Sequence, residues 1–390
     1  MGGEYVYFVP EELKSNADIE MYDVEAKVLL HRTGDRLIAG VDKVQMLALK
    51  NLYLLLPNTE HTADFLCACL NSSLLGWERQ RITRDEGETF AQLKGTQVAR
   101  LPIRKIDFTT PEDEREQHVE ALIRDYEEAR RSAPPPADTA VLDAVEEHLN
   151  ADPGSPDPRP ERAQSGTGPE RADIIHDLLA YLAREMTQLK EARQDLERAF
   201  DPFKYLPRGA SATPFSEAFS DEIKYAELVQ SPVDVTQAQH SIDDARLVEA
   251  DGTWVLEVRL KKRRPENWTE WQKEDGAIVR MWAPVLQFRD LDAEKARFYR
   301  FALPHLDAFS DDAFSGTIFP GGYTRTVKER LWATPVPAYD ASIDLDDLVD
   351  LERQIQKTER TIAFTDTLID QIVYQLYGLS EEEVAVVEEK

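Results

Sequence analysis

Residues 27–42 read KVLLHRTGDRLIAGVD and place two apolar runs on either side of the tripeptide Thr33-Gly34-Asp35. Apolar and β-branched residues on both sides of a Gly-Asp pair predict two strands, at residues 28–30 and 36–41, joined by a tight turn. Arg32 and Arg36 stand at the two ends of that turn. Because a sheet fixes the position of such a turn, both guanidinium groups can be placed to meet a partner, with Asp35 tethering one of them. The alternative is that both pair with Asp35 or nearby carboxylates and only stabilise the turn.

Positive charge is concentrated in residues 27–105 of an otherwise acidic chain. This segment contains 12 Lys and Arg against 8 Asp and Glu, a net charge of +4, whereas the formal net charge of the chain is -28. Phosphate contacts supply most of the affinity of a nucleic-acid-binding protein and need Lys or Arg at the surface. The segment therefore predicts a polyanionic partner.

Further elements are expected in the same region. Short strands are predicted at residues 5–9 and 47–56, and apolar residues spaced by three and four predict a helix at residues 62–79. The helix runs into a basic segment that contains Arg79, Arg81 and Arg84. These arginines either contact phosphate or are solvated charges, which are favoured at a helix C-terminus.

Four short motifs carry a resemblance to a known family. They are VLLHRTGDRLIA at residues 28–39, KNLY at 50–53, LNSSLL at 70–75 and LPI at 101–103. This pattern resembles the TaqI-like C-terminal specificity domain of adenine-specific DNA methyltransferases, and IDQIVYQLYGLS at 369–380 is similar to the ends of such enzymes. The resemblance implies a restriction-modification system, including the type IIG enzymes that fuse cleavage to methylation, and a double-stranded DNA partner.

The catalytic motifs of the resembled family are absent from the sequence. It contains neither a glycine-rich cofactor loop after a strand nor an Asn-Pro-Pro-Tyr motif for the flipped adenine. The resemblance therefore implies no cofactor in this chain, with S-adenosylmethionine held by a methyltransferase catalytic domain or subunit elsewhere. The opening MGGEYVYF reads like the interior of a larger enzyme.

Length and composition indicate the number of domains and the kind of cellular environment. A chain of 390 residues with 42% hydrophobic side chains predicts two or three domains, and no apolar run reaches the roughly 18 residues of a membrane span. Cys67 and Cys69, two apart on a helix, point to different faces and are expected to be buried thiols, which fits a reducing cytoplasm. Sixteen lysines against 30 arginines in so acidic a chain favour a halophilic source, although an acidic surface can also repel nucleic acid.

Long helices are expected on both sides of a central segment. After a helix at 111–131, Pro and Gly recur through 132–171, which predicts a disordered linker with only 139–149 able to form a helix. Apolar stripes then mark helices at 174–200 and 348–376. From the pattern alone, the two helices form either an antiparallel coiled-coil pair or ordinary amphipathic helices on separate cores. The resemblance implies the antiparallel pair, because specificity subunits of restriction systems use long helices as spacers between DNA-reading modules.

Between these helices, Asp251-Gly252 predicts a hairpin that joins strands at 247–250 and 253–260. Residues 277–288 and 297–303 are also predicted to be strands. The second hairpin strand runs into Lys261, Lys262, Arg263 and Arg264 near several tryptophans. This basic run either contacts the DNA backbone or is a solvated hairpin end.

Nuclease chemistry has only a weak signal here. The commonest restriction fold needs an acidic residue followed by Glu-x-Lys, and Glu257-Val258-Arg259 has arginine in place of the lysine, with Asp243 or Asp251 as the leading carboxylate. The seven histidines have no metal-ligand spacing. An autonomous Mg²⁺-dependent nuclease and a coiled-coil assembly subunit remain the alternatives to a DNA-recognition module.

Together these observations predict an α+β chain. Its expected parts are a β-rich DNA-recognition domain at 1–108, a helical spacer at 109–200, a second α/β domain at 201–340 and a long and a short helix at 341–390. We expect no metal site and no catalytic residue. The predicted DNA-contacting residues are Lys27, His31, Arg32, Thr33, Arg36, Arg79, Arg81, Arg84, Lys94, Lys261, Lys262, Arg263 and Arg264.

Overall fold

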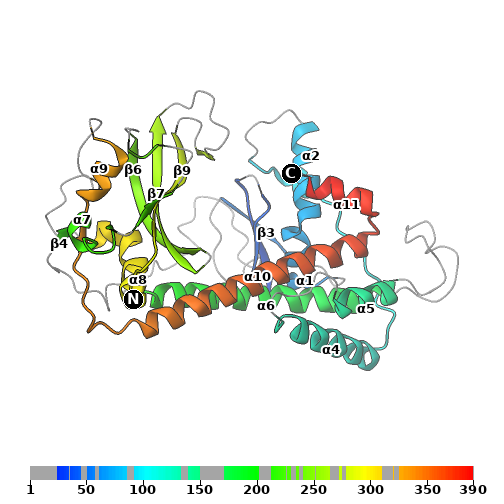
Figure 1. Ribbon diagram of the computed structural model, residues 1–390. Helices are drawn as coiled ribbons and strands as arrows, with labels where there is room; N and C mark the ends of the chain where they lie inside the picture. The colour runs from blue at the N-terminus through cyan, green and yellow to red at the C-terminus, as the bar shows by residue number, and fades with distance from the viewer. Residues whose placement is uncertain are drawn as a thin grey trace, which may run out of the picture. The chain divides into compact units, whose positions relative to one another are not determined.

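A computed structural model of the chain shows a mixed helix and sheet protein, which confirms the predicted α+β class (Figure 1). The residues that the structure describes are 24–34, 36–44, 51–57, 61–85, 92–132, 139–149, 171–201, 212–224, 226–229, 234–236, 240–250, 252–263, 272–274, 278–309, 319 and 325–389. The chain divides into two compact units: unit 1 is Met1–Asp195 with Gln356–Lys390, and unit 2 is Leu196–Ile355. Among the described residues, no helix is both long and apolar enough to cross a membrane.

Unit 1 contains a three-stranded antiparallel sheet in the order β2-β1-β3. Its strands are β1 (Lys27–His31), β2 (Ala39–Asp42) and β3 (Leu52–Leu55). The strand predicted at 28–30 is confirmed, whereas the strand predicted from residue 36 begins only at Ala39. The predicted strand at 5–9 and residues 47–50 of the next one lie outside the described residues.

The helix predicted at 62–79 is two helices, α1 (Ala63–Asn71) and α2 (Ser73–Asp85). Thr62 caps α1, because its side chain accepts a hydrogen bond from the N–H of Phe65 at 3.2 Å. Ser72 has the extended values φ -66° and ψ 152°, so the helix stops there and restarts in a new direction. A one-turn helix, α3 (Gly95–Val98), follows.

Longer helices complete unit 1. They are α4 (Glu112–Ala129), α5 (Ala140–Leu149), α6 (Ala172–Ala199), α10 (Asp346–Tyr377) and α11 (Glu381–Glu388), of which α6 and α10 continue into unit 2. The helical stripes are confirmed, and both α6 and α10 contribute to one apolar core with β1 and α1. Their antiparallel coiled-coil pairing stays a prediction. In the predicted linker, α5 buries Val141 and Val145, while 133–138 and 150–170 lie outside the described residues.

Unit 2 is built on a larger antiparallel sheet. The sheet order is β5-β9-β7-β6, with β8 paired to β9, and a separate pair joins β10 to β4. The strands are β4 (Ala212–Pro214), β5 (Glu227–Leu228), β6 (Ser241–Ala250), β7 (Thr253–Arg263), β8 (Gln272–Glu274), β9 (Ile278–Phe288) and β10 (Pro335–Pro337). The predicted hairpin is confirmed: Ala250 pairs with Thr253 across a turn in which Gly252 has a φ of +73°.

The strand predicted at 297–303 is wrong, since these residues lie in helix α8 (Ala293–Ala302) and in the 3-10 turn Leu303–Phe309 that follows it. Asp292 starts α8 by accepting a hydrogen bond from the N–H of Lys295 at 2.9 Å. Its buried residues Phe298, Tyr299 and Phe301 join the core of unit 2, and α8 packs against β6 (Figure 1). The short helices α7 (Phe215–Ala218) and α9 (Val327–Trp332) share this core.

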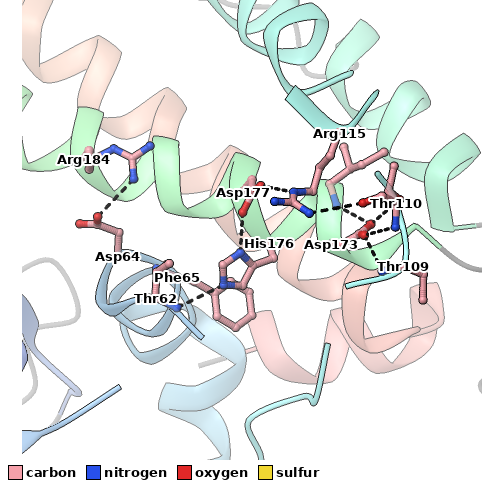
Figure 2. Close-up of polar contacts among 11 residues, drawn as sticks. Thr62, Asp64, Phe65, Thr109, Thr110, Arg115, Asp173, His176, Asp177 and Arg184 are labelled. Atoms are coloured by element: carbon pink, nitrogen blue, oxygen red, sulfur yellow. Dashed lines mark hydrogen bonds and ion pairs between the residues drawn. The ribbon is translucent and has the colours of Figure 1, made fainter. Parts of the chain in front are cut away.

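A buried polar network fixes the start of α6 in unit 1 (Figure 2). The carboxylate of Asp173, which is fully buried, accepts hydrogen bonds from the N–H groups of Thr109 at 3.0 Å and Thr110 at 2.7 Å, and from the Thr110 hydroxyl at 2.8 Å. The N–H of Ile174 donates to the same carboxylate at 3.0 Å, and these four donors replace the water that burial removes. Asp173 therefore ties α6 to the segment that enters α4.

The neighbouring His176 ties α6 to the start of α1 (Figure 2). Its Nε2 accepts a hydrogen bond from the N–H of Thr62 at 3.3 Å, so Nδ1 carries the proton and donates to Asp177 at 2.8 Å. Burial raises the pKa of Asp177, but hydrogen bonds from His176 and Arg115 outweigh it and hold the pKa below its ordinary value. Because both ring nitrogens are engaged and the ring is buried, His176 is a structural link and not a general base.

We expect Asp173→Ala to lower the free energy of unfolding by about 3 kcal/mol, because three N–H groups and a hydroxyl lose their buried acceptor. Urea unfolding of the full chain measures the change. Asp350→Ala is the matched control, since this exposed carboxylate only pairs with Arg353 at 2.6 Å and its loss should cost less than about 0.5 kcal/mol. Equal unfolding midpoints for the two variants would show that the Asp173 network does not stabilise unit 1.

Candidate nucleic-acid interface

The turn between β1 and β2, residues 32–38, is held by backbone hydrogen bonds. The N–H of His31 donates to the carbonyl of Ile38 at 2.9 Å and closes the turn. The N–H of Arg32 donates to Asn51 at 3.0 Å, and the carbonyl of Arg32 accepts from Leu93 at 2.7 Å. The turn is therefore tied both to the start of β3 and to the segment before α3.

Gly34 lies at the tip of this turn and has a φ of +119°, a backbone conformation that only glycine adopts at low cost. Its carbonyl accepts a hydrogen bond from the guanidinium of Arg79 on α2. Asp35, which stands between the two arginines in the sequence, lies outside the described residues. Helix α2 thus holds the tip of the turn through one side chain.

Several side chains of the turn face solvent. Thr33 and Arg36 are exposed, and Ile38 is 60% exposed. His31 is half-buried, and its Nδ1 lies 2.5 Å from the carbonyl oxygen of Thr33, so this nitrogen donates the hydrogen bond. The turn therefore presents a hydroxyl, a guanidinium and an apolar side chain on a fixed backbone.

Arg32 differs from Arg36 in its surroundings. It is half-buried, and its guanidinium carbon lies 4.8 Å from the centroid of the Tyr53 ring. The Tyr53 hydroxyl in turn donates to the carbonyl of Leu93 at 2.8 Å. A guanidinium stacked on an aromatic ring gains a cation–π attraction, so Arg32 stabilises the base of the turn and Arg36 is its more accessible cation.

Two predicted DNA-contacting residues are buried, which corrects the sequence-based prediction. Lys27 is fully buried, and its Nζ lies 2.7 Å from the carboxylate of the equally buried Asp42. Arg79 is only 4% exposed and donates a hydrogen bond to the Gly34 carbonyl. Burial of a cation requires a partner inside the protein, so these side chains are structural and do not reach a phosphate in this structure.

Three further predicted DNA-contacting residues of unit 1, Arg81, Arg84 and Lys94, lie on α2 and at the start of α3. Arg81 is 58% exposed and makes a two-pronged hydrogen bond to Glu78, at 2.8 Å for each prong. Arg84 belongs to the end of α2, but its side chain is outside the described part of the structure. Lys94 is exposed and directly follows Leu93, whose N–H binds the turn. The backbone thus brings Lys94 next to Arg32.

The basic run that begins at Lys261 belongs to unit 2. Lys261 is half-buried in β7, opposite Ser241 and Arg280. Lys262 and Arg263 end this strand, and their side chains lie outside the described residues, as does all of Arg264.

The carboxylates considered for a nuclease are engaged by arginines. Asp243 accepts hydrogen bonds from Arg259 at 2.9 Å and Arg280 at 2.8 Å, and Glu257 accepts one from Arg246 at 2.8 Å. Asp251 is outside the described residues. Nowhere in the described residues do three His, Cys, Asp or Glu side chains gather in a way that could hold a metal ion. This arrangement does not favour Mg²⁺-dependent cleavage at Glu257.

The two cysteines are buried and free, as predicted. Burial raises the pKa of Cys67 to about 11, and burial together with Cys67 raises the pKa of Cys69 further. Since the thiolate is the reactive form, both thiols are unreactive at neutral pH and neither is a candidate catalytic group.

Sequence reasoning missed two contributors to this surface. It assigned Ile38 to a strand, although this residue ends the turn and projects into solvent. It also missed Gln97, a buried side chain whose Oε1 accepts from the N–H of Lys94 at 2.8 Å and so fixes the segment beside the turn. A glutamine three residues after a helix start is a local signal for such a contact.

Comparison with known proteins identifies this region. Residues 1–103 match the family model of the TaqI-like C-terminal specificity domain. No curated protein and no solved structure matches the chain. The matched residues include β1, β2, β3, α1, α2 and α3, and so every residue of the fixed turn and its Arg79 support. Residues 1–103 of this chain are therefore similar to the TaqI-like C-terminal specificity domain and are called the specificity domain below; the β1–β2 turn lies within them.

Proposed function

We propose that this chain recognises the DNA site of a restriction-modification adenine methyltransferase whose catalytic half is a separate domain or subunit. One observation carries the proposal: within a specificity domain, a turn with a fixed backbone presents Thr33, Arg36 and Ile38 to solvent. The partner is double-stranded DNA, and the DNA-contacting groups are these side chains with their basic neighbours.

The chemistry of the turn suits the edges of base pairs in a groove. The planar guanidinium of Arg36 can donate two hydrogen bonds to O6 and N7 of guanine. The Thr33 hydroxyl can form a hydrogen bond with either a donor or an acceptor on a base edge. An apolar side chain such as Ile38 can contact the methyl group of thymine. Backbone hydrogen bonds at His31, Arg32 and Leu93 hold the turn, which reduces the conformational entropy that binding loses there.

Basic residues beside the turn are suited to phosphate. Arg81 and Lys94 are exposed and lie in the same unit as the turn. Phosphate contacts fix the register of a protein on a duplex, while base contacts select the sequence. The basic run of unit 2, Lys261, Lys262, Arg263 and Arg264, is proposed as an additional contact with the DNA backbone.

The acidity of the chain shapes this recognition. A formal net charge of -28 repels DNA at long range, and a halophilic source would further weaken phosphate contacts through counterion release. Salt at molar concentration shortens the Debye length to about 3 Å, so the repulsion is also screened. Under such conditions direct contacts with base edges select the site.

We expect Arg36→Ala to reduce discrimination between the target and a scrambled duplex, by about 1–3 kcal/mol if the guanidinium reads a base. If Arg36 holds phosphate instead, all sequences should weaken alike and the salt slope should fall by about one. Binding isotherms over a salt series, with the catalytic half present, measure both quantities.

Arg353→Ala is the matched control for this measurement. It also removes one exposed arginine, 73% accessible and paired with Asp350 in unit 2, so it changes the net charge equally. Unchanged affinity, slope and discrimination for Arg36→Ala, or equal losses for the two variants, would remove the turn from the DNA interface.

A further prediction concerns binding of the cofactor. We expect the 390-residue chain alone to show no saturable heat with S-adenosylmethionine in calorimetry, because the family's cofactor loop and Asn-Pro-Pro-Tyr motif are absent from the sequence. Adding the catalytic half in trans should restore methyl transfer to one adenine in a defined site. Stoichiometric cofactor binding by the chain alone would contradict the division of labour proposed here.

A further inference from the structure

The end of the chain is part of the same core as the specificity domain. Buried residues of α10 and α11 pack in one apolar cluster with Val28 and Leu30 of β1 and Phe65 of α1. These residues of α10 and α11 are Leu368, Ile369, Ile372, Val373, Tyr374, Leu376 and Val387. Helix α11 also lies against α2 (Figure 1). Residues far outside the matched first 103 therefore complete the core of the matched domain.

A single carboxylate of α10 binds the first residue of α2. The N–H of Ser73 donates to Oδ1 of Asp370 at 2.7 Å, and the Ser73 hydroxyl donates to Oδ2 at 2.7 Å, across 297 residues of sequence. The first N–H groups of a helix lack partners within the helix and carry its partial positive charge. Asp370 thus caps α2 from another helix.

This cap is half-buried. Burial raises the pKa of Asp370 above its ordinary value, and the hydrogen bonds from Ser73 only partly oppose that effect. The charged groups that act on it, Asp366 and Glu388, are acidic and raise its pKa as well. The two hydrogen bonds from Ser73 therefore stabilise the Asp370 carboxylate against the unfavourable effects of burial and of the two acidic groups.

Helix α2 connects this cap to the tip of the turn. Ser73 and Arg79 are six residues apart on α2, or about 9 Å along the helix axis. Arg79 then donates to the carbonyl of Gly34. A helix segment this short behaves as a rigid rod, so a displacement of its N-terminus moves Arg79 and with it the turn.

A second link fixes the end of α10 to the end of the matched region. The Tyr377 hydroxyl donates to the carbonyl of Pro102 at 2.8 Å and accepts from the N–H of Arg104 at 3.0 Å. The Arg104 guanidinium also donates to the carbonyl of Leu376. Asp370 is therefore held on both sides: by its own hydrogen bonds to α2 and by the attachment of its helix.

We infer that Asp370 is a positioning residue for DNA recognition: it fixes α2 and, through Arg79, sets the orientation of the turn that carries Thr33 and Arg36. The inference rests on the proposed function and adds a residue outside the matched family region. It also assigns the last turns of α10 a role in positioning the DNA-contacting turn of the specificity domain.

The test compares Asp370→Ala with Asp370→Asn in the full chain. Alanine removes both acceptors, whereas asparagine keeps an acceptor for the N–H of Ser73 and can donate to its hydroxyl. Hydrogen exchange without DNA reports on the amides of His31 and Leu93, which bind the turn. We expect exchange there to be several-fold faster in Asp370→Ala, and discrimination between target and scrambled duplexes to fall about five- to tenfold. Asp370→Asn should restore both values to near wild type.

Ser380→Ala is the matched control, since Ser380 caps α11 in the same unit by accepting from the N–H of Glu383 at 3.4 Å. It should lower stability by a similar amount while leaving the turn amides and the discrimination unchanged. A double-mutant cycle with Arg79→Met adds a test of the route. If Asp370 acts through Arg79, the effects of Asp370→Ala and Arg79→Met on discrimination should not add.

The outcomes separate this inference from the proposed function. If Arg36→Ala lowers discrimination but Asp370→Ala behaves like Ser380→Ala, or adds fully to Arg79→Met, the positioning role is wrong and the proposed function stands. If Asp370→Ala loosens the turn while Arg36→Ala leaves DNA discrimination unchanged, the link between α10 and the turn is real and the proposed function is wrong, along with the role of Asp370 in recognition.

Discussion

The hydrogen bond from the buried guanidinium of Arg79 to the carbonyl of Gly34 is the constraint on which the candidate surface depends. An arginine inside a protein is costly unless its donors are satisfied, so this contact favours one position of the turn. Gly34 permits the backbone conformation of the turn, because a positive φ has little steric cost for glycine. The backbone of the turn determines the positions of Arg36 and Thr33.

The specificity domain is larger in space than its match in sequence. The match ends at residue 103, yet the core that supports β1 and α1 also contains residues of α6 and of α10. Asp173 and His176 attach α6 by buried hydrogen bonds, and Asp370 and Tyr377 attach α10. A recognition surface that must hold its geometry on DNA gains from such supports, because base readout tolerates little displacement.

What the sequence predicted well was local. The Asp251-Gly252 hairpin and the helices α4, α6 and α10 follow from dipeptide and periodic signals that need no distant partner. Residues 297–303 were misassigned because a short apolar run fits a strand and a buried helix equally, and the Asp292 cap decided between them. Lys27 and Arg79 were predicted to contact DNA because the sequence alone does not show that they are buried. Their burial depends on Asp42 and Gly34, which lie elsewhere in the chain. The cap of α2 by Asp370 has no local signal at all.

Photo-crosslinking from the turn tests most directly the claim that it lies on DNA. A Thr33→Cys chain can be labelled selectively with a photoreactive maleimide, because Cys67 and Cys69 are buried thiols with raised pKa. Ala341→Cys, at an exposed position of unit 2, serves as the reference. With duplexes selected by the wild-type protein from a random pool, the label at position 33 should crosslink to one defined position of the enriched site, and the label at 341 should not. Crosslinking from 341 alone, or none from 33 on DNA that the protein demonstrably binds, would contradict the account.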